Sequence, residues 1–223
     1  NGFVVKFATD SADFEYTHTT SALMRGVRPN FFRAGTDNDG VKQLGQQFRD
    51  KSKPLGRWLS LGLDCVTLEN VRREVGSKGL SVGSKREYPS VITEAAVVAW
   101  PGKNAYDKIA MAQELRSQKQ EHTKIELGKW KQCVTMDAEG ALHVETTITV
   151  DDSVVNDLPR RGIEFAIPSS MSRSTFFSRG PHENYVDRQF SAHNGVYEEC
   201  VPERPSTYVV PQEQGNRMSL KWM

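Results

Sequence analysis

The chain has 223 residues, of which 37% are hydrophobic and 26% are charged, so it can build a core but contains no apolar run long enough to span a membrane. Its 29 Lys and Arg residues nearly balance its 28 Asp and Glu residues, and a net charge of +1 gives no field that would hold the chain on nucleic acid or on an anionic membrane. We therefore expect a globular protein with no nucleic-acid partner and no membrane partner.

Alternation of apolar and polar residues is the commonest pattern, and this period of two predicts strands. In residues 142–150, Leu142, Val144 and Ile148 lie on one face, while His143 and Glu145 lie on the other. Residues 130–136 and the turn residues 137–140 complete a predicted β-hairpin. Further strands are predicted, in chain order, at residues 3–8, 64–74, 80–87, 91–100, 162–167, 175–178, 196–201, 208–211 and 218–222.

Helix is scarce in this pattern. Residues 56–63 predict a short helix that turns Trp58 and Leu59 inward, whereas residues 106–119 predict a polar, charged insertion. Residues 91–100 are apolar on both alternating faces and should be buried on two sides. No repeat or break in composition divides the chain, so we expect one all-β sandwich domain over residues 1–223.

Several residues and short motifs typical of metal, disulfide or nucleophile sites are present, but the residues around them do not support those functions. Cys65, Cys133 and Cys200 fall in no CxxC pair, which predicts reduced core cysteines. The GxSxG pattern at residues 79–83 is not followed by a helix, so we expect no nucleophile there. The acidic residues at 37–40 do not fit the register of a calcium loop and are expected to cap local backbone groups. The five histidines show no metal-ligand spacing.

Three dense motifs mix aromatic, charged, Gly and Pro residues in a way that core packing alone does not require. They are RPNFFRAGTDNDG at residues 28–40, RGPHENYVDR at residues 179–188 and YVVPQEQGNR at residues 208–217. We expect them to form irregular loops whose polar groups have fixed partners. Glu183 and Asp187 lie close in sequence, but we expect them to form structural ion pairs with Arg179 and Arg188 rather than to flank a sugar.

In this order and spacing, the three motifs resemble the small-chain domain of the large β-galactosidases of glycoside hydrolase family 2. The family signatures RPxFxRAxTDND, GPxENYxDR and YxxPQExGNR are all present, and Leu158, Pro159, Arg160 and Gly162 match its LPRxG segment. The likeness spans nearly the whole chain and is weakest over residues 99–124.

This resemblance implies a β-supersandwich of the galactose-mutarotase-like type, which agrees with the strand-rich pattern. It implies a parent enzyme that hydrolyses terminal β-galactosides with retention, through two glutamates in a separate barrel domain, so that this chain has no catalytic residue and is inactive alone. It also implies no cofactor and no metal in this chain, with a divalent cation such as Mg²⁺ at the parent's barrel site. The implied partners are the remaining domains of the parent and a galactoside; a homo-oligomer and a cytoplasmic or periplasmic location stay open.

The resemblance also gives expectations for individual residues. We expect a loop, anchored at its start and reaching about Phe48, to form part of the active-site rim; its anchor residues are Asp37, Asn38, Asp39 and Gly40. We expect Tyr185 to bury its ring and to find a partner for its hydroxyl group. The residues expected to serve structure or interdomain packing are Arg33, Glu183, Asn184, Tyr185, Asp187, Arg188, Glu213, Asn216 and Arg217.

Two departures from the family pattern bear on these expectations. Gly35 stands where the family has proline, and the family's GGDDSW segment is missing, so we expect a sandwich truncated at its C-terminus. One alternative is a carbohydrate-binding module that stacks sugars on exposed aromatic residues such as Trp58, Trp130 or Phe176. Another is a mutarotase-like epimerase, for which the sequence offers no recognisable pair of His and Glu.

Overall fold

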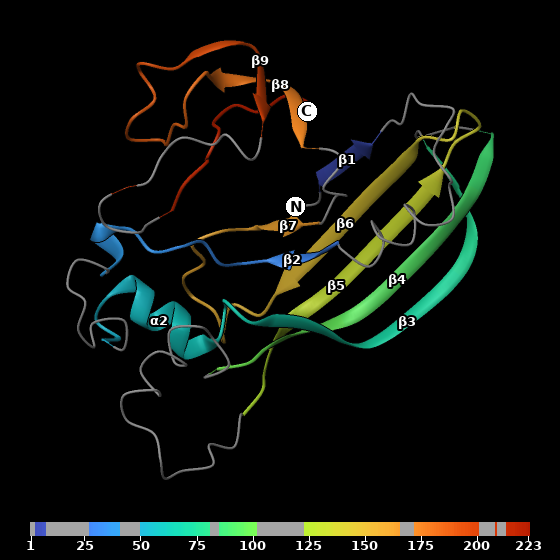
Figure 1. Cartoon of the computed structure of the whole chain (residues 1–223). Coiled ribbons are helices and arrows are strands. Elements are labelled where there is room, and N and C mark those ends of the chain that lie inside the picture. Colours follow the sequence, from blue (N-terminus) through green and yellow to red (C-terminus); the bar gives the residue numbers. More distant parts are fainter. Residues whose placement is uncertain are drawn as a thin grey trace.

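The computed structural model describes residues 3–7, 27–40, 50–80, 85–101, 123–165, 172–200, 208 and 213–223. Strands dominate these residues and the sheets stay open, which confirms the all-β sandwich class (Figure 1). None of the described helices is long and apolar enough to cross a membrane.

A five-stranded antiparallel sheet in the order β1-β6-β5-β4-β3 forms the largest layer. Its strands are β1 (Phe3–Phe7), β3 (Val66–Gly79), β4 (Glu87–Ala99), β5 (Ile125–Met136) and β6 (Leu142–Val150). The predicted hairpin is confirmed: β5 and β6 pair from Met136 opposite Leu142 to Gly128 opposite Val150. Asp137 holds its turn, because its carboxylate accepts hydrogen bonds from the amides of Glu139 and Ala141.

The long hairpin of β3 and β4 corrects one prediction. The sequence predicts a separate strand at residues 80–87, but β3 continues to Gly79, β4 begins at Glu87, and the described residues between them, Leu80, Lys85 and Arg86, are not in a strand. Residues 81–84 lie outside the described residues. No helix follows Gly79 among the described residues of this connection, and Ser81 itself lies outside them. Burial of β4 on both faces is confirmed at its end, where Val97, Val98 and Ala99 are all buried.

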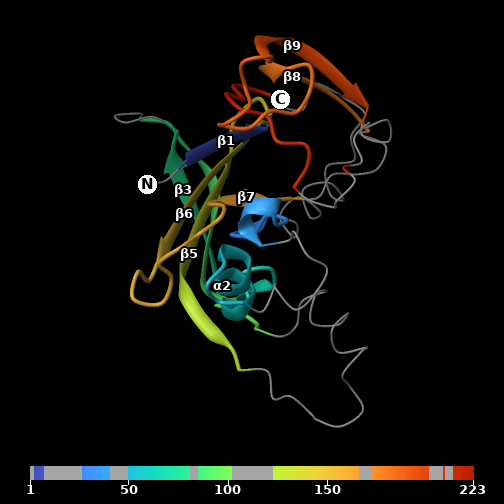
Figure 2. The same cartoon turned by 90° about the vertical axis from the view of Figure 1, so that its left-hand side faces the viewer.

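The helix α2 (Pro54–Leu61) packs on one face of this sheet (Figure 2). Trp58 and Leu59 are buried in the core between them, which confirms the predicted inward orientation of both side chains. Lys53 is its N-cap, Pro54 takes the first helical position, and Gly62 ends it in the left-handed conformation. The core between helix and sheet contains Leu55, Trp58 and Leu59 from α2, Val97 and Ala99 from β4, and Leu127 and Trp130 from β5.

Two small antiparallel sheets complete the fold: β2 (Arg28–Asn30) with β7 (Gly162–Glu164), and β8 (Arg173–Gly180) with β9 (His193–Cys200). A short 3-10 helix, η1 (Asp37–Asp39), follows β2. The strand predicted at 218–222 is wrong: this segment contains a turn and forms only an isolated bridge from Trp222 to Phe177 of β8, beside a hydrogen bond from the amide of Arg179 to the carbonyl of Met218. The predicted strand at 208–211 and the insertion at 106–119 lie outside the described residues, apart from Tyr208.

Candidate functional site

The first motif, residues 28–40, ends in the short helix η1, which the side chain of Asp39 stabilises. Oδ2 of Asp39 accepts hydrogen bonds from the amide and the hydroxyl of Thr36, each at 2.8 Å, and from Nη1 of Arg33 at 2.6 Å. Burial acts to raise the pKa of Asp39, but the hydrogen bonds from Arg33 and Thr36 outweigh it and hold the pKa below its ordinary value. Asp39 therefore caps a local backbone group, as the sequence predicts, whereas Oδ1 of Asp37 is buried and has no hydrogen-bond partner among the described residues.

The guanidinium of Arg33 joins this motif to the core. Its Cζ lies 5.0 Å from the centroid of the Trp58 ring in α2, a cation–π contact. Trp58 is 3% exposed, and the nearby loop is thereby fixed against the helix. The continuation of the loop through Phe48, which the sequence assigned to an active-site rim, lies outside the described residues beyond Gly40.

Glu213 from the third motif links three segments that are distant in sequence. One carboxylate oxygen accepts a hydrogen bond from the amide of Ala34 at 2.8 Å, and the other is bound by Arg160. Glu213 is buried, and Arg160 belongs to the LPRxG segment. Both oxygens of this carboxylate are therefore engaged by the chain itself.

Glu183 from the second motif is engaged in the same way. Its Oε2 accepts a hydrogen bond from the amide of Gly215 at 2.6 Å, and its Oε1 accepts one from the hydroxyl of Tyr208. Arg188 lies 3.6 Å from Oε1, and its guanidinium covers the rings of Tyr185 at 4.6 Å and Tyr208 at 5.4 Å. The second and third motifs are thus joined by charge and by stacking.

Asn184 and Arg217 add further links around this cluster. The Asn184 side chain donates to the carbonyls of Arg179 and His182 and accepts from the amide of Met218. Arg217 donates to Glu199 at 3.1 Å and lies over the ring of Phe176 at 5.6 Å. These contacts bind the third motif to β8 and β9.

The surroundings of the Tyr185 hydroxyl group differ from those that the sequence predicts. The hydroxyl is buried and makes no hydrogen bond of good geometry to the described residues, whereas the sequence predicts a partner for it. Burial raises the pKa of Tyr185, and the negative charges of Glu183 and Glu213 raise it further. The backbone of Asn216 lies near enough to act against this rise in its pKa. The phenol therefore loses its proton only at a higher pH than an ordinary tyrosine does.

The expected ion pairs of this motif are also partly wrong. Arg188 contacts Glu183 as expected, but Asp187 is exposed and forms no ion pair with Arg188 or Arg179. Arg179 instead donates to the carbonyl oxygens of Gln189 and Ala192, each at 3.2 Å. Residues 185–188 form a tight turn, in which the amide of Arg188 donates to the carbonyl of Tyr185 at 3.0 Å.

The aromatic residues suggested for sugar stacking are buried. Trp58, Trp130 and Phe176 are 3%, 1% and 1% exposed, so none of them offers a face to a ligand. This finding contradicts the expectation of exposed aromatics on which the carbohydrate-binding alternative was based. All three side chains serve the packing of the sheets.

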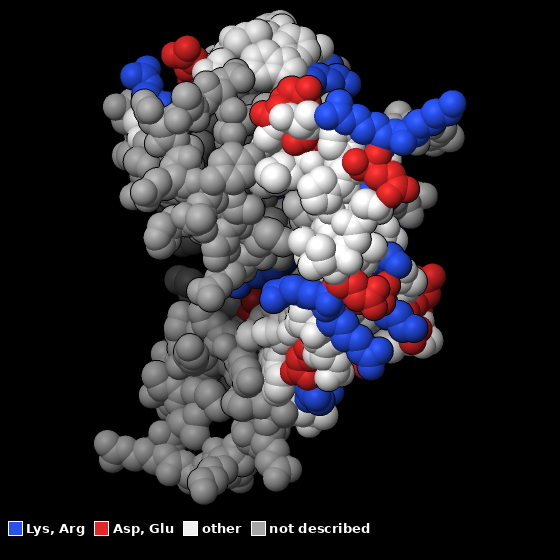
Figure 3. Space-filling model, turned by 90° about the vertical axis from the view of Figure 1, so that its right-hand side faces the viewer, with Lys and Arg blue, Asp and Glu red and all other residues white. Residues whose placement is uncertain are grey.

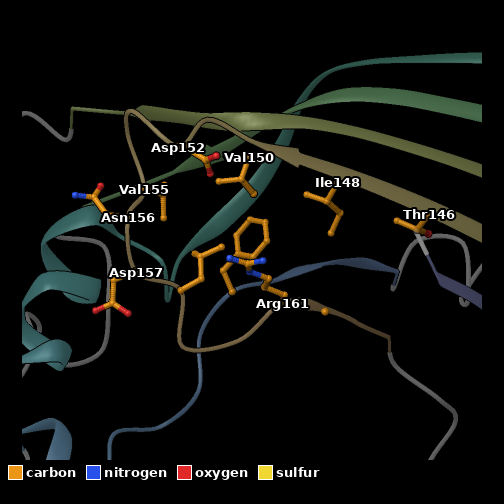
Figure 4. A pocket seen from close by; sticks show the side chains of 11 residues that line it. Thr146, Ile148, Val150, Asp152, Val155, Asn156, Asp157 and Arg161 are labelled. Carbon is orange, nitrogen blue, oxygen red and sulfur yellow. The ribbon is translucent and has the colours of Figure 1, made fainter. Parts of the chain in front are cut away.

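A cavity of about 240 Å³ lies between β6 and the segment that leads to β7 (Figure 4). Ile148 and Val150 form its apolar side, and Asp152, Asp157 and Arg161 bring charges to it (Figure 4). Asp157 is already paired with Arg57 at 2.7 Å. The cavity is smaller than most small-molecule sites, and no sequence motif marks it, because its apolar side is the ordinary inner face of a strand.

Metal ligands are not gathered in the described part of the chain. There, no group of three or more His, Cys, Asp and Glu residues could hold an ion. Cys65, Cys133 and Cys200 are free, as expected, but half-buried rather than in the core. The described histidine contacts pair His143 with Asp137 and His182 with Ser191, so neither gives the pair of His and Glu that an epimerase would need.

The chain is similar in sequence to known β-galactosidases. Residues 1–223 match the sequence family described as "Beta galactosidase small chain". The chain is 31% identical over 199 residues to a β-galactosidase of Vibrio cholerae and 32% identical over 219 residues to one of Alteromonas mediterranea; these alignments cover 89% and 92% of this chain. A β-galactosidase of Priestia megaterium is 25% identical over 91% of the chain. The matched regions are 16%, 17% and 15% of these three relatives, so the chain spans about one sixth of their length.

Proposed function

The chain belongs to the β-galactosidase small-chain family, and from this premise we propose that it is a non-catalytic domain of a β-galactosidase that hydrolyses terminal β-D-galactosides. Its role is to support the rim of an active site whose catalytic glutamates lie in another domain. Its partners are the remaining domains of the parent enzyme and, through them, a galactoside.

The engagement of Glu183 and Glu213 carries this proposal. A retaining glycosidase needs two carboxyl groups about 5–5.5 Å apart on either side of the bond that breaks, one to attack and one to donate a proton. Both oxygens of Glu183 and both oxygens of Glu213 are instead held by amide, hydroxyl or guanidinium donors of the chain itself. The two signature glutamates act as structural links between loops.

The rim role is supported by the turn at Asp37–Asp39. Asp39 is buried and holds Thr36 and Arg33, so the loop that follows Gly40 leaves from a fixed point. A fixed point of departure lets such a loop be placed reproducibly against another domain. The open, strand-rich architecture supports a galactose-mutarotase-like supersandwich as the fold that carries the loop.

Hydrolysis of a chromogenic β-galactoside tests the proposal. We expect the 223-residue chain alone to show no activity, and a parent β-galactosidase lacking its small-chain region to gain activity when this chain is added. The variant Asp39→Asn should bind the parent but should raise KM or lower kcat in the mixture, whereas the exposed variant Asn194→Ala should match the unchanged chain. Turnover by the chain alone would contradict the proposal.

A carbohydrate-binding module is the other candidate function. No observation on the described residues favours it, since its proposed stacking residues are buried. Calorimetric titration with galactose and lactose distinguishes the two functions, because measurable affinity in the isolated chain would support the binding module.

A further inference from the structure

The strand β3 lies at the edge of the five-stranded sheet, where it pairs with β4 on one side (Figure 1). Among the described residues no strand pairs with its other side. All residues from 70 to 77 are exposed, and Val75 is 85% exposed. A long edge strand with free backbone groups is a template for pairing with another strand.

The part of β3 that is suited to pairing can be located. A bulge between Glu69 and Arg72, with Asn70 at a φ of 53°, interrupts the first part of the strand. From Arg72 to Gly79 the register with β4 is unbroken. A bulge disrupts pairing where it occurs, so residues 72–79 form the regular segment of this edge.

This regular segment is complementary to itself. When two copies run antiparallel about a two-fold axis at Gly76, Glu74 of one lies opposite Lys78 of the partner subunit, and the symmetry forms this pair twice. Val75 lies opposite Ser77 of the partner subunit. Shifting the axis to Val75 would place Arg72 opposite Lys78 of the partner subunit, and cross-strand pairs of like charge are destabilising.

Gly76 suits a position on the axis. A Cβ at this position would meet only Oγ of Ser90, at 3.9 Å, so the surroundings of Gly76 are open. Lys78 forms an ion pair with Glu145 within its own chain, but an ammonium group has three donors and can bind a second carboxylate. The face seen in Figure 3 carries basic and acidic side chains together, instead of the single-sign charge that keeps sheet edges apart.

We propose that β3 pairs antiparallel with β3 of a second copy of this chain, with the two-fold axis at Gly76. The two sheets then continue into one another, and the edge of each copy is covered by the other. This inference is independent of the proposed function, since it uses only the edge strand and its charges. An isologous contact of this kind closes after two copies and does not extend into a filament.

Sedimentation of the full 223-residue chain tests the proposal through its charges. We expect a concentration-dependent dimer. Glu74→Lys and Lys78→Glu should each weaken it about tenfold, because each creates two pairs of like charge in the dimer. The double variant that exchanges the two charges should restore the dimer. Lys129→Glu, on the exposed face of β5, is the matched control and should leave the dimer unchanged.

Cross-linking tests the register itself. Gly76→Cys places two thiols opposite each other on the axis and should give a disulfide-linked dimer on mild oxidation. Glu74→Cys is the control, because its two thiols would be four residues apart along the strands, about 13 Å, and should link no faster than the unchanged chain. A monomer at every concentration overturns the proposal. So does a dimer that ignores the charge variants, or one in which Gly76→Cys links no faster than Glu74→Cys.

Discussion

Asn184 and Asn216 hold each other through two reciprocal hydrogen bonds. The amide of Asn184 donates to the carbonyl of Asn216 at 2.9 Å, and Nδ2 of Asn216 donates to the carbonyl of Asn184 at 2.7 Å. Each residue belongs to a different family signature, and Asn184 is 0% exposed. The second and third motifs therefore form one structural unit.

Removing the Asn184 side chain should destabilise the protein strongly. Asn184→Ala removes one donor from the carbonyls of Arg179 and His182 and the acceptor of the Met218 amide, while the Arg179 carbonyl keeps the hydroxyl of Ser178. We expect the free energy of unfolding in urea to fall by about 2 kcal/mol, since a group left without its partner costs about 1–3 kcal/mol when it is buried. The exposed Asn194→Ala should change it by less than about 0.5 kcal/mol, and equal effects of the two variants would contradict this role.

Asp39 should contribute a pH-dependent part of the stability. Its folded pKa lies below the ordinary value of 3.8, so its contribution is fully present above that value and is lost as the pH falls through the lowered pKa. We expect Asp39→Asn to reduce the dependence of unfolding free energy on pH in the acid range. Asp187→Asn, at an exposed carboxylate with no ion pair in the described structure, is the control, and an identical loss of pH dependence there would refute the assignment.

Removing the buried hydroxyl of Tyr185 should not destabilise the protein. Tyr185→Phe removes a polar group that has no hydrogen-bond partner in the described part of the chain, so we expect the unfolding free energy to stay the same or rise by up to about 1 kcal/mol. Tyr185→Ala removes the ring and should cost about 3 kcal/mol. A large loss in Tyr185→Phe would show that the hydroxyl does have a partner.

The same residue should titrate at unusually high pH. Because its folded pKa is raised above 10.0 by burial and then by Glu183 and Glu213, ionisation of Tyr185 disfavours the folded state: the full stability is present below pH 10 and is lost as the pH rises through the folded pKa. The difference in phenolate absorbance between the unchanged chain and Tyr185→Phe measures this directly. A difference that appears below pH 10 would contradict the assignment.

Two glycines of the sheets should respond differently to alanine. Gly128 has a φ of 153°, and a Cβ there would overlap the carbonyl oxygen of Thr149, whereas a Cβ at Gly162 would meet nothing within 4 Å. We expect Gly128→Ala to lower the melting temperature, with a cost of about 2 kcal/mol from strain. Gly162→Ala should be neutral or slightly stabilising, and equal melting curves would show that β5 relaxes around the new methyl group.

Local patterns predicted the central hairpin well, because alternation directly reports the two faces of a strand. Apolar spacing alone places the helix two residues too late, at 56–63, because it does not use Pro54 and Gly62, which fix the start and the end of α2 (Pro54–Leu61). The same alternation misplaced the strand at 80–87. The residue at which a strand ends depends on where its pairing with the neighbouring strand ends. The pairing of β3 with β4 extends to Gly79 opposite Glu87.

The links within the candidate site could be foreseen only in part. The motifs indicated which side chains would have fixed partners, but Glu213 and Glu183 bind backbone amides of Ala34 and Gly215, and any residue type can supply an amide. Only the fold decides which amide is near. For the same reason, the sequence could not show that the hydroxyl of Tyr185 is left without a partner.

The pairing of β1 with β6 fixes the order in which the strands of the large sheet can pair while the chain is being synthesised. Phe3 lies opposite Thr146, whereas β3, β4, β5 and β6 each pair with the strand that precedes or follows them in the sequence. The meander can therefore form hairpin by hairpin as it leaves the ribosome, at about 5–20 residues per second. Residues 3–7 emerge before any of these strands, yet they must wait for β6, so the part of the sheet that is translated first is the last to find its neighbour.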